Sequence, residues 1–159
     1  MPYADWAGVT HDLTSSLERL DDGDFLIMGE PSVPRGPGHS RLLGPPSSPA
    51  PTRYVQALRV DELFVAECVG ATSLGGTWDM ADGTIEQIRS LGWLTPAESK
   101  SFYDNPTPNF EMFVELADAS ALAELMVASL MVLRTHPDDL LLQTSDDLSA
   151  LRLTPTGAS

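Results

Sequence analysis

The sequence predicts an α+β fold in which helices pack on an antiparallel β-sheet. Residues 53–70 have the pattern of two strands, rich in β-branched and aromatic residues and joined by a short acidic turn. Apolar residues recur at helical spacing near the start of the chain and again towards its end. The expected order is helix, three strands, helix, strand, helix, with a possible short last strand at 140–143. That order is typical of one sheet covered by helices.

The central hairpin has a register that its turn predicts. If Asp61 and Glu62 form the turn, Gln56 lies opposite Glu67 on one face, while Cys68 points to the other face. We interpret Gln56 and Glu67 as a cross-strand hydrogen bond that fixes the register, in preference to a pair that reads a ligand. Both faces of the hairpin are largely apolar. We therefore expect helices to cover one face and more protein, or a partner, to cover the other.

Two further strands complete the expected sheet, and three helices are expected to pack on it. Apolar residues at steps of three and four predict a one-sided helix at 5–20, and a short apolar run at 24–28 predicts the first strand. A helix is expected at 77–91, with Ala81 facing inward and Gly92 at its end. Residues 109–116 alternate as a strand does. The helix expected at 118–134 is apolar on nearly all sides, so most of its surface should be covered.

Composition and charge limit the class of protein. At 159 residues, we expect a single domain, 1–159. The net charge is -14, which argues against binding to nucleic acid or to an anionic membrane surface. No stretch has the length and apolarity of a membrane span, and the N-terminus lacks the pattern of a signal peptide. We expect a cytoplasmic protein.

The single cysteine gives little sign of chemistry. Cys68 cannot form an intramolecular disulfide, and no histidine or second cysteine lies at metal-ligand spacing from it. We expect no metal and no cofactor. A buried structural cysteine is favoured over a nucleophile, because a thiolate needs a base and a positive environment.

Two segments are expected to lie outside the packed fold. Residues 30–52 hold seven of the 13 prolines together with several glycines and serines, which predicts a flexible loop inserted between two strands. A spacer is favoured there over a polyproline ligand. Residues 146–159 are expected to form a frayed C-terminal tail.

A spaced set of short motifs carries a family resemblance. The motifs are Tyr54-Val55-Gln56, Glu67 in the next strand, Leu91-Gly92-Trp93 with Pro96, and Pro108-Asn109-Phe110. Together they resemble the TY-Chap domain of actinobacteria, which belongs to a larger group similar to type III secretion chaperones and YbjN-like proteins. The resemblance covers about residues 6–142, and the proline-rich insertion departs from it.

The resemblance implies a small non-catalytic, chaperone-like module of a kind that binds peptides or partner proteins and often forms homodimers. Its fold would be that of the secretion chaperones. The matching positions have roles that can be structural, and they are Tyr54, Gln56, Glu67, Gly92, Trp93, Asn109 and Phe110. A dimer or partner contact is expected through the sheet or through the apolar helix at 118–134, where the candidate residues are Leu122, Met126, Leu130, Met131 and Leu133.

Two other functions remain open at this point. One is a small enzyme or ligand-binding domain with a pocket around Glu67, Gln56 and Cys68. The other is a regulatory subunit of a larger bacterial assembly. Because no nucleophile elbow, phosphate loop or convincing pair of carboxylates is present, we prefer the non-enzymatic interpretation.

Overall fold

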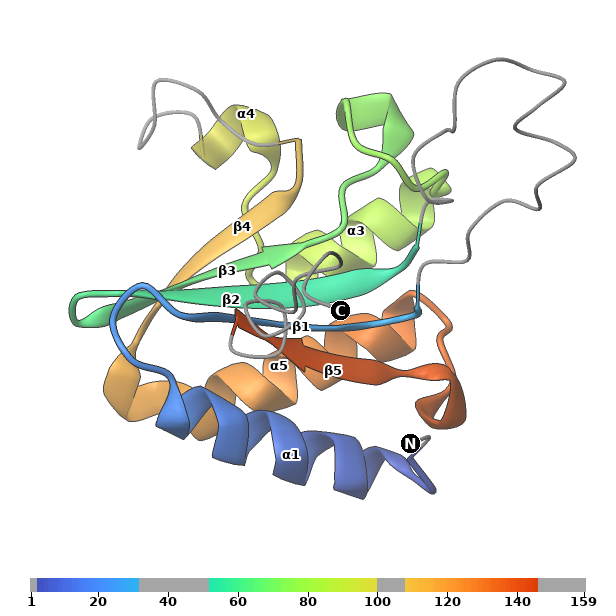
Figure 1. Cartoon of the computed structure of the whole chain (residues 1–159). Helices are drawn as coiled ribbons and strands as arrows, with labels where there is room; N and C mark the ends of the chain where they lie inside the picture. The colour runs from blue at the N-terminus through green and yellow to red at the C-terminus, as the bar shows by residue number, and fades with distance from the viewer. Residues whose placement is uncertain (1–2, 32–51, 100–107, 146–159) are drawn as a thin grey trace, which may run out of the picture.

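A five-stranded antiparallel sheet forms the centre of the computed structural model, which describes residues 3–31, 52–99 and 108–145 (Figure 1). The strand order is β4-β3-β2-β1-β5. The strands are β1 (Phe25–Gly29), β2 (Tyr54–Val60), β3 (Leu63–Cys68), β4 (Phe110–Glu115) and β5 (Leu141–Thr144). The predicted α+β class is confirmed, and the short last strand lies at the sheet edge beside β1. Most of the predicted loop at 30–52 and the predicted tail at 146–159 lie outside the described residues.

The central hairpin has the predicted register. Gln56 pairs with Glu67, and Val60 at the end of β2 pairs with Leu63 at the start of β3. Asp61 has a φ of 54°, a left-handed conformation that closes the tight turn between the two strands. At the other end, the Val69 amide donates to the Tyr54 carbonyl over 3.0 Å, which extends the pairing by one residue.

The helices α1, α3 and α5 lie on the same side of the sheet (Figure 1). They span α1 (Trp6–Arg19), α3 (Asp82–Ser90) and α5 (Ala119–Val132). A single helical turn, α4 (Pro96–Ser99), lies beside β4 and was not predicted. The described residues also include three 3-10 turns, η1 (Thr72–Leu74), η2 (Leu116–Asp118) and η3 (Pro137–Asp139).

The first helix follows its sequence pattern closely. Asp5 caps its N-terminus by accepting a hydrogen bond from the Gly8 amide over 2.9 Å. The second predicted helix, at 77–91, is shorter than expected because its regular turns begin only at Asp82. Ala81 is the N-cap and is exposed, so its expected inward position is wrong. Met80, one residue earlier, is buried instead.

The hydrophobic core fills the layer between the sheet and these helices. Alternate residues of the strands point into this layer; examples are Leu26 and Met28 of β1 and Phe64 and Cys68 of β3. A buried hydrogen bond crosses the same layer. The indole N–H of Trp93 donates over 2.7 Å to the Ser129 hydroxyl on α5.

The helix α5 is buried by its own chain. The side chains predicted for a partner contact divide sharply: four of them lie in the core and are at most 4 % exposed, namely Leu122, Met126, Leu130 and Leu133. Only Met131 of that set is open to solvent, at 52 %. In this fold the four buried residues cannot contact another chain, because they hold α5 against its own sheet and against α1. Most of the apolar side chains of α5 that suggested a partner are therefore buried in the chain's own core.

An ion pair joins the two ends of the segment between β1 and β2. The Arg53 guanidinium and backbone amide both donate to the Glu30 carboxylate. The same guanidinium donates to the Leu133 carbonyl over 3.0 Å at the C-terminal end of α5 and stands 4.9 Å from the centre of the Trp78 ring. Burial alone would raise the pKa of Glu30. The hydrogen bonds and charge of Arg53 outweigh that effect and hold the pKa below its usual value.

This ion pair makes stability depend on pH. A carboxyl whose pKa is lowered by folding stabilises the native state above its unfolded pKa and loses that contribution as the pH falls. We expect Glu30→Gln to lower the free energy of unfolding by about 1 kcal/mol at pH 7. The difference from the wild type should shrink below about pH 4, where the unfolded carboxyl becomes protonated. Urea denaturation of the wild type and the variant at pH 7 and pH 3 measures this difference in the free energy of unfolding. An equal difference at both pH values would mean that the Glu30 carboxylate does not form a stabilising ion pair with Arg53.

The burial of α5 gives a second prediction. Met126→Ala should lower the free energy of unfolding by about 2–4 kcal/mol, because it leaves a cavity in the core. Met131→Ala, on the same helix but exposed, is the matched control and should change it by less than about 0.5 kcal/mol. Chemical denaturation checks both. Similar losses in the two variants would mean that Met131 is covered in solution, as a dimer through α5 would require.

Candidate functional site

The second face of the sheet is not covered by α1, α3 or α5. Because side chains alternate along a strand, the residues between the core positions all point to this side. We call it the open face, and it consists of Phe25, Ile27, Gly29, Tyr54, Gln56, Leu58, Val60, Leu63, Val65, Glu67, Glu111, Phe113, Glu115, Leu141 and Gln143. Four large apolar side chains on it are 37–41 % exposed, namely Leu58, Val60, Leu63 and Leu141. Exposed apolar residues gathered on one face indicate an interaction surface.

The strand register arranges the open face in rows that cross the sheet. One row, which we call the central row, contains one residue from each strand: Gln143, Ile27, Gln56, Glu67 and Glu111. The next row towards the hairpin turn is apolar, and its members are Phe25, Leu58, Val65 and Phe113. Two amides and two carboxylates therefore form a polar line beside an apolar one.

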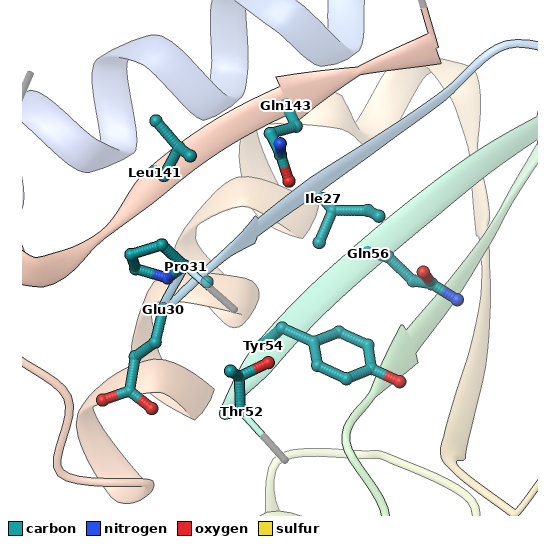
Figure 2. A pocket seen from close by; sticks show the side chains of 9 residues that line it. Ile27, Glu30, Pro31, Thr52, Tyr54, Gln56, Leu141 and Gln143 are labelled. Carbon is teal, nitrogen blue, oxygen red and sulfur yellow. The ribbon is translucent and has the colours of Figure 1, made fainter. Parts of the chain in front are cut away.

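A hollow of about 280 Å³ lies at one end of the open face (Figure 2). Side chains of three adjacent strands surround it, including Ile27, Tyr54 and Gln143. Gly29 forms part of its floor, directly opposite Tyr54. A Cβ atom at Gly29 would lie 2.4 Å from the Tyr54 Cβ, so a larger residue cannot occupy this position without moving the strands. The floor of the hollow is bare backbone at this point.

Asn109 holds two open-face residues in place beside this hollow. Its Oδ1 accepts from the Gly70 amide over 3.0 Å, which directs the Nδ2 group away from that amide. Nδ2 then donates to the Tyr54 hydroxyl over 2.9 Å and to Glu67 Oε1 over 3.0 Å. Burial is the main cause that raises the pKa of Tyr54, and the nearby Glu67 carboxylate adds to the effect.

The structure brings together three of the residues that carried the family resemblance. Tyr54, Glu67 and Asn109 form one hydrogen-bonded group, while Gln56 lies beside Glu67 without bonding to it. The predicted Gln56–Glu67 hydrogen bond is therefore wrong, although the pairing of the two positions is confirmed. Glu67 bonds instead to Asn109, which reaches it from the segment before β4.

The other resemblance positions serve the fold. Gly92 has a φ of 111°, a left-handed conformation that ends α3 as predicted. Trp93 and Phe110 are buried in the core, at 2 % and 0 % exposed. They support the site only by fixing the elements around it.

Cys68 does not share a pocket with Glu67 and Gln56. It is fully buried on the helix-covered face, and burial raises the pKa of its thiol well above the usual range. Glu67 and Gln56 lie on the opposite face of the same strands. The pocket proposed for a small enzyme around these three residues is therefore not formed, and the prediction of a buried structural cysteine is confirmed.

One end of the central row is covered by α4 and by Leu94, two residues before it. The Ser99 hydroxyl lies 3.3 Å from Glu111 Oε1, and Glu111 is 1 % exposed. The backbone of Leu94 also pairs with Glu111 in both directions, at 2.8 and 3.0 Å, which closes part of the outer edge of β4. Sequence reasoning missed Glu111, Gln143 and Gly29; their positions opposite Glu67, Ile27 and Tyr54 follow only from the strand order.

The open face carries acidic groups without basic ones in the part of the chain that the structure describes. Glu67 is partly exposed and Glu115 is exposed. The described arginines lie elsewhere: Arg53 binds Glu30, Arg59 donates to the Leu20 carbonyl, and the rest are on or after helices, namely Arg19, Arg89 and Arg134. Within residues 3–31, 52–99 and 108–145, no cluster of three or more metal-ligating side chains occurs, and no helix has the length and apolarity to cross a membrane.

Comparison with models of protein families shows which family the chain belongs to. The model of the TY-Chap3 family, described as T3SS (YopN, CesT) and YbjN peptide-binding chaperone 3, matches residues 2–146. The chain belongs to this family. No curated protein and no solved structure shows significant similarity to it. The TY-Chap resemblance drawn from short motifs is thus confirmed at the level of the family, and the match includes every strand of the open face.

The hydrogen bonds of Asn109 in this TY-Chap3 chain can be tested by replacing its side-chain NH₂ group with an oxygen. Asn109→Asp replaces the Nδ2 donor, so that a carboxylate faces Glu67 and the Tyr54 hydroxyl. We expect a loss of about 2 kcal/mol in the free energy of unfolding at pH 7. Folding raises the pKa of a carboxyl placed against another one, so the deficit should narrow as the pH falls and the new group is protonated.

A matched control separates this effect from added charge alone. Gln143→Glu also adds a carboxylate to the open face, but it does so away from Glu67, and it should cost less than about 0.5 kcal/mol. Denaturation at pH 7 and pH 4 compares the two variants. Equal losses would mean that Asn109 does not face Glu67.

The burial of Cys68 predicts that the TY-Chap3 fold protects its thiol. In the native protein it should react with an aromatic disulfide reagent at least about a hundred times more slowly than in 6 M guanidinium, because the thiolate is both disfavoured and inaccessible. Absorbance of the released thiolate follows the reaction. Rapid modification of the native protein would show that Cys68 is open to solvent.

Proposed function

We propose that this chain is a chaperone-like protein that binds peptides or segments of partner proteins on the open face of its sheet. The family description names peptide-binding chaperones, and four of the six exposed large apolar side chains of the described residues lie together on the open face, between polar ones. The single observation that carries the proposal is that α1, α3 and α5 all pack on the other face of the sheet. This packing leaves Leu58, Val60, Leu63 and Leu141 in contact with solvent.

The face offers more room than the sheet edges. Addition of a client strand would require a free edge, at β4 or at β5. The outer edge of β4 is already engaged by Leu94 at Glu111, and β5 has only four residues. The open face extends over five strands and includes the hollow beside Gly29. A segment lying on the face therefore has more surface to contact than a segment added to an edge.

The action proposed is capture without chemistry. The open face has carboxylates, amides and one tyrosine hydroxyl, and the group formed by Asn109, Tyr54 and Glu67 is held by internal hydrogen bonds. These bonds fix the shape of the face before a client arrives, which reduces the entropy lost on binding. We place this activity in the cytoplasm, and the homodimer stays a prediction. Met131 is the accessible apolar residue that α5 could offer to a second copy.

Binding of peptides from a defined array tests the proposal. An array of twelve-residue segments of varied composition should yield binders, and ¹⁵N NMR titration of the 17.1 kDa protein should locate them. Shifts are expected at Ile27, Gln56, Leu58 and Val65. The proposal is wrong if no segment binds, or if the shifts are confined to α1 and α5.

A pair of substitutions assigns the binding to the face. Leu58→Asp should weaken the binding of an array-selected peptide by at least about tenfold, since it puts a charge among the exposed apolar residues. Met131→Asp introduces the same charge at an exposed position on α5, and it should leave the affinity unchanged. Fluorescence anisotropy measures both, and thermal unfolding checks that each variant is folded. Equal effects of the two substitutions would place the peptide elsewhere.

A further inference from the structure

We propose that the client segment is basic as well as apolar, and that it crosses the strands along the central row in an extended conformation with a Lys or Arg side chain at Glu67. This inference rests on the proposed function and adds the chemistry of the client. It follows from the length of the row, from the polar groups along it and from the charge of the face.

The central row is long enough for a short extended segment. It crosses five strands, which are separated by four spacings. At about 4.8 Å per spacing, the row is roughly 19 Å long, which matches about six residues of extended chain. α4 covers the row at Glu111, so the accessible part extends over three spacings from Gln143 to Glu67. It is about 14 Å long and matches about four residues of extended chain. A segment lying there would reach the carboxylate at the covered end.

Two amides along the row can bind a peptide backbone. Gln56 and Gln143 are both partly exposed, and their side chains form no hydrogen bond with another residue of the described chain. Each amide has one acceptor and two donor hydrogens, so it can pair with both the C=O and the N–H of an extended client. Ile27 stands between the two amides and offers an apolar contact in the same line.

The surfaces on either side of the row suit alternate side chains of such a segment. Successive side chains of an extended chain point to opposite sides. On one side lies the hollow beside Gly29 and Tyr54. On the other side lie Leu58 and Val65, in the apolar row. A client with apolar side chains on both sides would therefore have a surface for each of them, and its cation would lie at Glu67 in the row itself.

The negative charge of the open face favours a positively charged client. Glu67 accepts from the Asn109 amide, a neutral partner that orients the carboxylate without cancelling its charge. Glu115 adds a second carboxylate, and the basic residues of the described chain lie off this face. The net charge of -14 attracts a basic segment from a distance. A second copy of this chain on the same face would bring carboxylates against carboxylates, so we assign the face to a basic client.

Three matched peptides test the charge. Eight-residue peptides that alternate leucine with serine would carry arginine, citrulline or glutamate at one central position. We expect the arginine peptide to bind the wild type about tenfold more tightly than the citrulline peptide. The glutamate peptide should bind most weakly. The preference for arginine should fall as NaCl is raised from 50 to 500 mM, because added salt screens the interaction with a partly exposed carboxylate.

The variant Glu67→Gln assigns the effect to one residue. It keeps an acceptor for Asn109 and removes the charge, so the variant should lose most of the preference for the arginine peptide over the citrulline peptide. Glu115→Gln, nearer the hairpin turn, should keep most of the preference. The comparison of the three peptides and its salt titration use only the wild type, so they test the preference for a basic client even if Glu67→Gln does not fold.

The outcomes separate this inference from the proposed function. If arginine and citrulline peptides bind the wild type equally well, the charge preference is wrong while peptide binding stands. If none of the three peptides binds and the varied array also yields no binder, the proposed function itself fails. Concentration-dependent NMR shifts at Leu58 and Val65 without any peptide would show a second copy on the face and overturn the inference.

Discussion

The structure depends on covering one face of the sheet and leaving the other open. Strand residues alternate between two environments, and α1, α3 and α5 all pack on the same side. Alternate residues of β1, β2 and β3 therefore point to the helix-covered side, where all of them except Arg59 are in the core, and their neighbours are on the open face. A register shift of one residue would exchange the two sets, which is why the turn at Asp61 and the bonds of Asn109 matter for both stability and binding.

Polar contacts at the sheet margins hold this arrangement. Arg53 ties β2 to Glu30 and to the C-terminal end of α5, while Asn109 ties the start of β4 to Tyr54 and Glu67. Both join segments far apart in the sequence. The first acts on the covered side and the second on the open side, so the sheet is fixed in position against its helices and its binding groups are held in one geometry.

Local patterns predicted the fold well. The hairpin register followed from a two-residue turn, and the first helix from the spacing of its apolar residues, because both depend on neighbours in the sequence. The site was predicted only in part. Glu67 and Asn109 were identified by resemblance, but their contact depends on how β3 and β4 pair across 42 residues. Four of the five residues expected at a partner surface on α5 lie in the core, because an apolar helix in a small protein can also be covered by its own chain, and Met131 is the exposed one.

The placement of the ion pair between Glu30 and Arg53 has a consequence for variation in chain length. β1 and β2 are antiparallel neighbours, and the ion pair fastens the point where one strand ends and the next begins. A flexible insert placed between these two residues would cost only about 0.6 kcal/mol for each doubling of its length. This junction is a natural site for inserting a reporter sequence or a second module, since both ends of the insert would leave the sheet together at its margin.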